Sequence, residues 1–204
     1  MMTRICSSLL FLALTAISLT AFATTPPEEP PAIKYYTYAH NDAEYSVKLP
    51  EAPTVETIWA TTEYASYLGT TPADNTRLGE IATLKRVDLN TDDLFDVKIT
   101  FLKVTDQFLR GLSEGVIKKS VASELKDVSL THESFNMSSS PGGLKWATMT
   151  GFSVNKNNQP LFNAVHYLTG LQSILVVRVA YSPQNDLFKD YYKTLVDSIS
   201  YHPL

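Results

Sequence analysis

The segment LQSILVVRVAY, residues 171–181, is the most apolar run of the chain beyond its N-terminal 23 residues. A strand points successive side chains to opposite faces. Both faces of this segment are apolar, with Leu175, Val177 and Val179 on one and Ile174, Val176 and Ala180 on the other. A strand of this kind is covered on both sides of its sheet. The segment therefore predicts a central strand with a helical layer on each face.

Three further strand-like segments precede it, at residues 127–137, 143–155 and 159–168. The connectors between them are short and rich in turn-forming residues, such as SSSPGG and Lys156-Asn157-Asn158. Short connectors of this type join antiparallel neighbours, so the four segments predict a meander. Arg178 interrupts the apolar pattern of the last strand. Its side chain either reaches the sheet edge or pairs with an acid such as Glu133, and the sequence leaves both open.

The earlier part of the chain is also rich in strands. Residues 34–40 and 44–50 flank a turn-forming Asn-Asp pair and predict a hairpin. Further strands are predicted at residues 54–60, 80–88 and 94–104, the last with a clear period of two. Together with the meander, these segments predict an α+β fold with an antiparallel sheet of about six to eight strands.

Two amphipathic segments predict the covering helices. The first is expected from Thr105, as N-cap, to Leu125. The second is expected to begin with Ser182 as cap and Pro183 in its first turn, and to end at His202-Pro203. A helix on each face makes the predicted architecture an α/β/α sandwich.

The N-terminus has the pattern of a secretory signal. One positive charge in MMTR precedes an apolar stretch, and Ala21-Phe22-Ala23 supplies small residues for cleavage after Ala23. The alternative is a retained anchor, because residues 5–23 approach the roughly 20 residues that span a bilayer. We expect a proline-rich linker at residues 24–33 and a single domain at residues 34–204. The expected location is the periplasm or the cell exterior, with no stable membrane span after cleavage.

Composition excludes several classes of function. The chain has a net charge of -4 and no basic cluster that would bind nucleic acid. Its single cysteine, Cys6, lies within the predicted signal, so the processed chain has no thiol for a disulfide, a metal site or a nucleophile.

The first candidate binding surface is the segment from Thr61 to Gly79, which is rich in turn-forming residues. Long loops in compact domains are often functional. We therefore take Tyr64, Tyr67 and Arg77 as candidate binding residues. The alternative is a flexible insertion between two strands.

One stretch matches a catalytic motif literally. Gly111-Leu112-Ser113-Glu114-Gly115 fits the nucleophile elbow G-x-S-x-G, with His166 or His202 as the candidate partner histidine. The elbow needs a strand before the serine, whereas helical periodicity runs through this stretch. We therefore expect Ser113 inside a helix and no catalytic residue, with a serine hydrolase as an alternative.

The sequence does not predict a metal or cofactor site. The acidic stretch from Asp88 to Asp93 resembles a calcium loop but has Asp93 and Ile99 where the template needs Gly and Glu. An acidic hairpin tip is the expected reading, with cation binding left open. The four histidines lack zinc-ligand spacing, and His166 is expected to be a hydrogen-bonded histidine of the core or the sheet edge.

The order of these elements resembles the PsbP-like fold superfamily, which includes photosystem II subunits and DcrB-type bacterial envelope proteins. The similarity is carried by YSVKLP in the opening hairpin, by GLKWATMTGFS and NAVHYLTGLQSILVVRVAY in the meander, and by the closing Ser-Pro helix. The resemblance implies an antiparallel sheet between helical layers. It implies no catalytic residue, because the superfamily shares no active site.

The expected function is that of an exported, non-enzymatic binding or accessory protein of the bacterial envelope or secretome, with another protein as its partner. The first alternative is a carrier of a small apolar ligand or lipid, because a curved sheet closed by a helix can enclose a pocket. The second is the serine hydrolase that uses Ser113.

Overall fold

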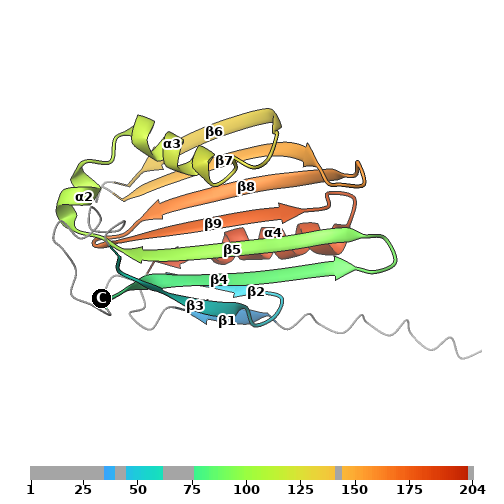
Figure 1. Ribbon diagram of the computed structural model, residues 1–204, viewed down its shortest axis with the longest axis horizontal. Helices are drawn as coiled ribbons and strands as arrows, with labels where there is room; N and C mark the ends of the chain where they lie inside the picture. Colours follow the sequence, from blue (N-terminus) through green and yellow to red (C-terminus); the bar gives the residue numbers. More distant parts are fainter. Residues whose placement is uncertain (1–34, 40–44, 62–75, 141–143, 202–204) are drawn as a thin grey trace, which may run out of the picture. The chain divides into compact units, whose positions relative to one another are not determined.

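The computed structural model describes residues 35–39, 45–61, 76–140 and 144–201, which form two antiparallel sheets and three helices (Figure 1). The smaller sheet has the order β1 (Tyr36–Ala39), β2 (Tyr45–Leu49) and β10 (Ser200–Tyr201). The larger sheet has seven strands in the order β3 (Thr54–Trp59), β4 (Arg77–Asp88), β5 (Asp93–Lys103), β9 (Ser173–Tyr181), β8 (Pro160–Thr169), β7 (Lys145–Val154) and β6 (Thr131–Ser139).

The apolar segment that decides the fold forms β9, the fourth of the seven strands. Leu175, Val177 and Val179 belong to the core beneath helix α4 (Asp186–Ser198), and Ile174 and Val176 belong to the core beneath the helices on the opposite face. Burying one such side chain stabilises the fold by about 1.5–3 kcal/mol. The predicted central strand, its cover on both faces and the α+β class are confirmed.

The strand predictions hold along the rest of the chain. β1 pairs with β2 as the expected hairpin, and β6, β7, β8 and β9 pair in sequence as the expected antiparallel meander. β6 begins later than predicted, at Thr131, because Val128 closes a turn by donating its amide to the Leu125 carbonyl at 2.9 Å. Among the described residues, no helix is long and apolar enough to cross a membrane.

The first predicted helix is in fact two short ones. Thr105 caps α2 (Asp106–Arg110) as expected, and its Oγ1 accepts from the Phe108 amide at 3.2 Å. The chain then leaves the helix, and Ser113 caps a second helix, α3 (Glu114–Ser123). The prediction of one continuous helix was wrong, because glycine weakens a helix and serine favours its cap. Leu112 between them is buried.

The closing helix begins and ends differently from the prediction. Asn185, not Ser182, is its N-cap and accepts from the Phe188 amide at 3.2 Å. Ser182 is fully buried, and its Oγ accepts from the Leu94 amide of β5 at 2.9 Å, so it is held by the sheet instead. The helix ends at Ser198, after which β10 pairs with β2.

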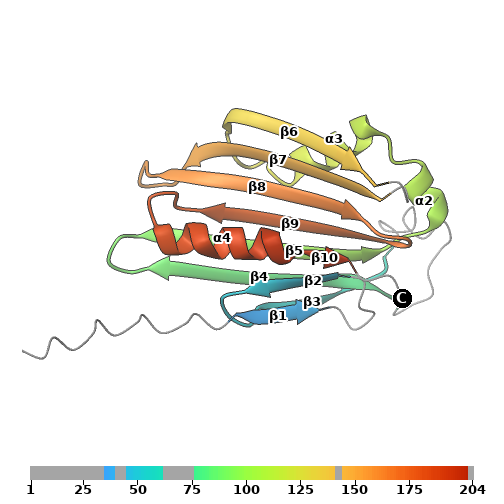
Figure 2. The same ribbon diagram turned by 180° about the vertical axis from the view of Figure 1, so that it is seen from behind.

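The two helical layers are staggered across the sheet. α4 packs on β9 and β2, and the small sheet lies on the same side (Figure 2). α3 packs on β7 and β8 from the opposite side (Figure 1). On the α4 side, the β6 residues Ser134, Asn136 and Ser138 are consequently exposed. The stagger leaves room beside α4, where the candidate site lies.

Candidate ligand-binding site

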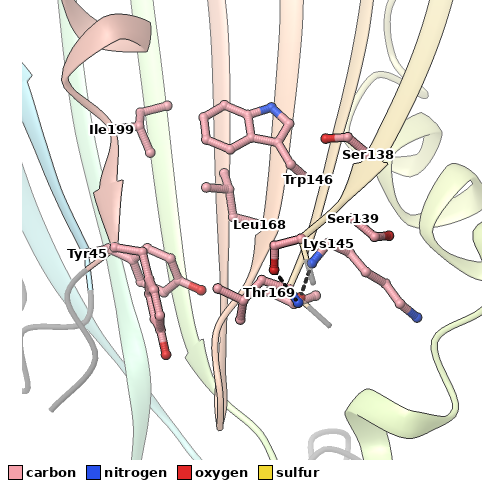
Figure 3. Close-up of a pocket in the computed structure, with 11 residues that line it drawn as sticks. Tyr45, Ser138, Ser139, Lys145, Trp146, Leu168, Thr169 and Ile199 are labelled. Atoms are coloured by element: carbon pink, nitrogen blue, oxygen red, sulfur yellow. Dashed lines mark hydrogen bonds between the residues drawn. The ribbon is translucent and has the colours of Figure 1, made fainter. Parts of the chain in front are cut away.

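An apolar pocket of about 340 Å³ lies where the chain leaves α4 and enters β10 (Figure 3). Its volume falls at the lower end of the range for small-molecule sites, about 300–1,000 Å³. The walls come from β2, from the ends of β6, β7 and β8, and from the C-terminal segment. The large lining residues are Tyr45, Trp146, Leu168, Ile199 and Tyr201.

Strand pairing brings these distant residues together. Tyr45 of β2 is directly opposite Tyr201 of β10, and their ring centroids are 5.3 Å apart. Trp146 of β7 is directly opposite Leu168 of β8. Each wall of the pocket is therefore a cross-strand pair, and such pairs have fixed separations because the register of the strands is fixed.

Hydroxyl groups form the rim of the pocket. Ser138, Ser139, Ser140 and Thr169 line it together with Leu144 and Lys145. Thr169 Oγ1 accepts from the Lys145 amide at 2.8 Å, and the Ser140 amide donates to the Leu144 carbonyl at 2.8 Å. These bonds fix the backbone at the entrance, while the exposed Ser138 and Ser139 offer further polar groups to a ligand.

A partly buried network of hydrogen bonds supports the Trp146 wall. Trp146 Nε1 donates to Thr148 Oγ1 at 3.0 Å, and the same oxygen lies 3.2 Å from Nδ1 of His166. The Nε2 atom of His166 lies 3.3 Å from the Tyr192 hydroxyl. Burial lowers the pKa of His166 to about 4 and raises that of Tyr192 to about 12. Both groups are therefore neutral near pH 7, and the expected hydrogen-bonded core histidine is confirmed.

The candidate binding loop stays a prediction. Tyr64 and Tyr67 lie outside the described residues. Arg77 is the first residue of β4, where its guanidinium forms an ion pair with Glu80, and it does not line the apolar pocket. The segment is closed at its base by the Ala60 amide, which donates to the Thr76 carbonyl at 2.8 Å.

Ser113 has the geometry of a helix cap. Its Oγ accepts from the Val116 amide at 3.3 Å, and the element before it is a helix instead of the strand that a nucleophile elbow needs. Our expectation of a serine within a continuous helix was wrong, since Ser113 precedes α3. His166 bonds to Thr148 and Tyr192, and His202 lies outside the described residues.

The carboxylates of Asp88 and Asp93 at the acidic hairpin tip accept hydrogen bonds from the tip and from the start of α4. Asp88 accepts from the Asn90 amide at 2.9 Å. Asp93 is buried and accepts from Thr91 Oγ1 at 2.8 Å, from Asn185 Nδ2 at 3.2 Å and from Gln184 Nε2, which joins the tip to the start of α4. Within the described ranges, no three His, Cys, Asp or Glu side chains are close enough together to hold a metal ion.

The Arg178 side chain has neither of the two predicted arrangements, at the sheet edge or paired with an acid. It lies on the central strand, and among the described residues no acid forms an ion pair with it. Glu133 belongs to the edge strand β6 at the far side of the sheet and does not reach it. Arg178 is half-buried in a cleft that Asp96 and Asn163 also line.

Sequence reasoning missed every large residue of the apolar pocket. Tyr45, Trp146 and Leu168 were assigned to strands, which is correct, but nothing local marks them as pocket residues. Ile199 and Tyr201 were assigned to the closing helix. Only the pairing of β10 with β2 reveals the pocket, and that pairing joins residues more than 150 positions apart.

Comparisons with known proteins find likeness only among solved structures. No family model matches the chain, and no curated protein is significantly similar. The solution structure of cyanobacterial PsbP from Synechocystis is 11% identical, with a TM-score of 0.48, and the match covers 86% of this chain and 96% of that one. The crystal structure of LpqN, involved in cell envelope biogenesis of Mycobacterium tuberculosis, is 13% identical, with a TM-score of 0.43, and the match covers 84% of this chain and 92% of that one.

Proposed function

We propose that this chain is an exported, non-enzymatic binding protein that takes the apolar part of a small molecule into the pocket between β10 and β7. The observation that carries the proposal is the pocket itself. It has an apolar wall of Tyr45, Trp146 and Leu168 and a hydroxyl rim, which is the usual composition of a ligand site. Export is proposed from the signal-like N-terminus.

The neutral aromatic network behind Trp146 favours an apolar ligand. His166 and Tyr192 are uncharged near neutral pH, so they place no charge behind the Trp146 wall. The hydrogen bond from Trp146 to Thr148 holds the indole in place before any ligand arrives. A wall that is already ordered loses little side-chain entropy on binding, which favours affinity for a small ligand.

Calorimetric titration with octan-1-ol tests the proposal. Ser138 is exposed, lines the pocket and is directly opposite Trp146, so Ser138→Trp should fill the entrance and abolish binding. Ser134→Trp is the matched control, because Ser134 is exposed on the same face of the same strand but does not line the pocket. Binding that is absent from the unmodified protein, or equal in both variants, would contradict the proposal.

A protein partner is the second candidate, and the opposite end of the sheet favours it. Leu89 at the β4–β5 tip is 90% exposed, and Val154 near the β7–β8 turn is 60% exposed. The two tips are neighbours, because Gln159 Nε2 donates to the Thr91 carbonyl at 3.4 Å. Adjacent exposed apolar side chains that form one patch are typical of protein-interaction sites.

A single introduced cysteine tests this second candidate, since the chain beyond residue 23 has none. Leu89→Cys carrying a photoactivatable crosslinker should form one stoichiometric adduct in the host envelope. The control is Thr83→Cys, on an exposed position of the sheet face. Equal labelling from both positions would remove the support for a partner at the tip.

A further inference from the structure

A second pocket adjoins the apolar one. It measures about 490 Å³ and shares Leu144, Lys145 and Thr169 with the first pocket. Its remaining lining comes from α2 and from the turn between β8 and β9, namely Asp106, Leu109, Arg110, Gly170 and Leu171. The two pockets therefore meet at one short segment, with an apolar cavity on one side and a charged one on the other.

The charged groups of the second pocket favour a single negative charge. Lys145 and Arg110 contribute two positive charges and Asp106 one negative charge, which leaves a net charge of 2 − 1 = +1 at the site. Of the residues that the structure describes, Lys145 is the only charged one that lines both pockets. A singly charged carboxylate matches this balance better than a phosphate monoester, which carries −1.5 to −2 charges.

Lys145 is oriented towards the second pocket. Its side chain points away from the apolar pocket (Figure 3), and its Nζ donates to the Leu112 carbonyl before α3. An ammonium group has three donors, so two remain for a ligand. The bond to Leu112 also holds the flexible lysine stem in place, which reduces the entropy that a ligand must overcome.

We infer that the ligand is a single-chain amphiphile with a carboxylate head. The apolar chain lies against the wall that Trp146 and Leu168 form, and the carboxylate accepts from Lys145 Nζ with Arg110 nearby. This inference rests on the proposed function and names its class of ligand. A neutral molecule of the same chain length would fill only the apolar pocket.

The test compares octanoate with octan-1-ol by calorimetry on the purified protein at pH 7.5, where octanoate is ionised. Octanoate should bind at least about tenfold more tightly, because a hydrogen bond to a charged group contributes about 1.5–3 kcal/mol. Lys145→Gln should remove this preference by weakening octanoate binding at least about tenfold more than octan-1-ol binding. Glutamine keeps an N–H donor for the Leu112 carbonyl. Lys119→Gln removes one charge from the exposed side of α3 and should keep the preference.

The outcomes separate this inference from the proposal beneath it. Equal affinities for octanoate and octan-1-ol in the unmodified protein would overturn the carboxylate assignment. The proposal that the apolar pocket binds an apolar ligand would be unaffected. A Lys145→Gln variant that weakens both ligands to the same extent would also overturn it, because lysine would then have only a structural role. Failure of both ligands to bind would end the proposed function and this inference together.

Discussion

The buried histidine behind the pocket gives the chain a calculable pH dependence. His166 has a pKa of about 4 in the folded protein, against 6.5 in an exposed chain, because burial disfavours its charged form. The unfolded chain therefore binds the extra proton first as the pH falls. Stability from this group is complete above pH 6.5, declines as the pH falls towards 4, and is constant below.

The magnitude follows from the two pKa values. At pH 5 the unfolded histidine is almost fully protonated and the folded one is mostly neutral, which lowers the free energy of unfolding by about 2 kcal/mol. Well below pH 4 the loss approaches about 3 kcal/mol. A loss of this size is a large part of the stability of a typical domain, about 5–15 kcal/mol.

Urea unfolding at pH 7.5 and pH 5 measures this loss, with His166→Gln as the comparison. Glutamine can still bond to the hydroxyls of Thr148 and Tyr192 but cannot take up a proton. The other three histidines are present in both proteins, so their effects cancel. The unmodified protein should lose about 2 kcal/mol more than the variant between the two pH values. Equal losses would refute the assignment of a buried, neutral His166.

Further substitutions at Gly79, Gly115, Ser113 and Asp93 test the fold. Gly79→Ala should destabilise the protein by about 1–3 kcal/mol in a urea titration, because the new Cβ would overlap the Phe101 carbonyl. In the same titration Gly115→Ala should stabilise α3 by about 0.5–1 kcal/mol, because its Cβ would lie 4.0 Å from Ser113 Oγ and meets no closer atom. Ser113→Ala should lower the free energy of unfolding by about 1 kcal/mol because the helix loses its cap, and Ser113→Asp should restore that stability. Labelling of Ser113 by a reactive-serine probe would contradict its role as a cap. Asp93→Ala should lower the free energy of unfolding by about 1–3 kcal/mol, because it leaves the side-chain amides of Gln184 and Asn185 without their acceptor. Asp127→Ala, at an exposed position, should change that free energy little. Equal effects of the two substitutions on thermal unfolding would argue against the contact between the tip and α4.

The sheet could be predicted because its signals are local. The two apolar faces of residues 171–181 require cover on both sides, and the short connectors before them require antiparallel neighbours. The structure places this segment at the centre of the large sheet with a helix layer on each face. Periodicity and turn chemistry were sufficient because each acts within a few residues.

The errors arose where a distant contact outweighs a local preference. Ser182-Pro183 looks like the start of a helix, but the Ser182 hydroxyl is held by the Leu94 amide, 88 residues earlier. The break between α2 and α3 was missed because Leu112 continues the apolar stripe and is buried, although the chain around it is not helical. The pocket was missed for the same reason, since Tyr45 and Tyr201 meet only through strand pairing.

The central claim is that Trp146 forms the wall of a ligand pocket. The chain has two tryptophans, so Trp59→Phe leaves Trp146 as the only indole reporter. Titration of this variant with octan-1-ol should produce a saturable blue shift of the Trp146 emission, as the ligand displaces water from the indole. An emission that does not change, or that drifts in proportion to the free alcohol without saturation, would contradict the account.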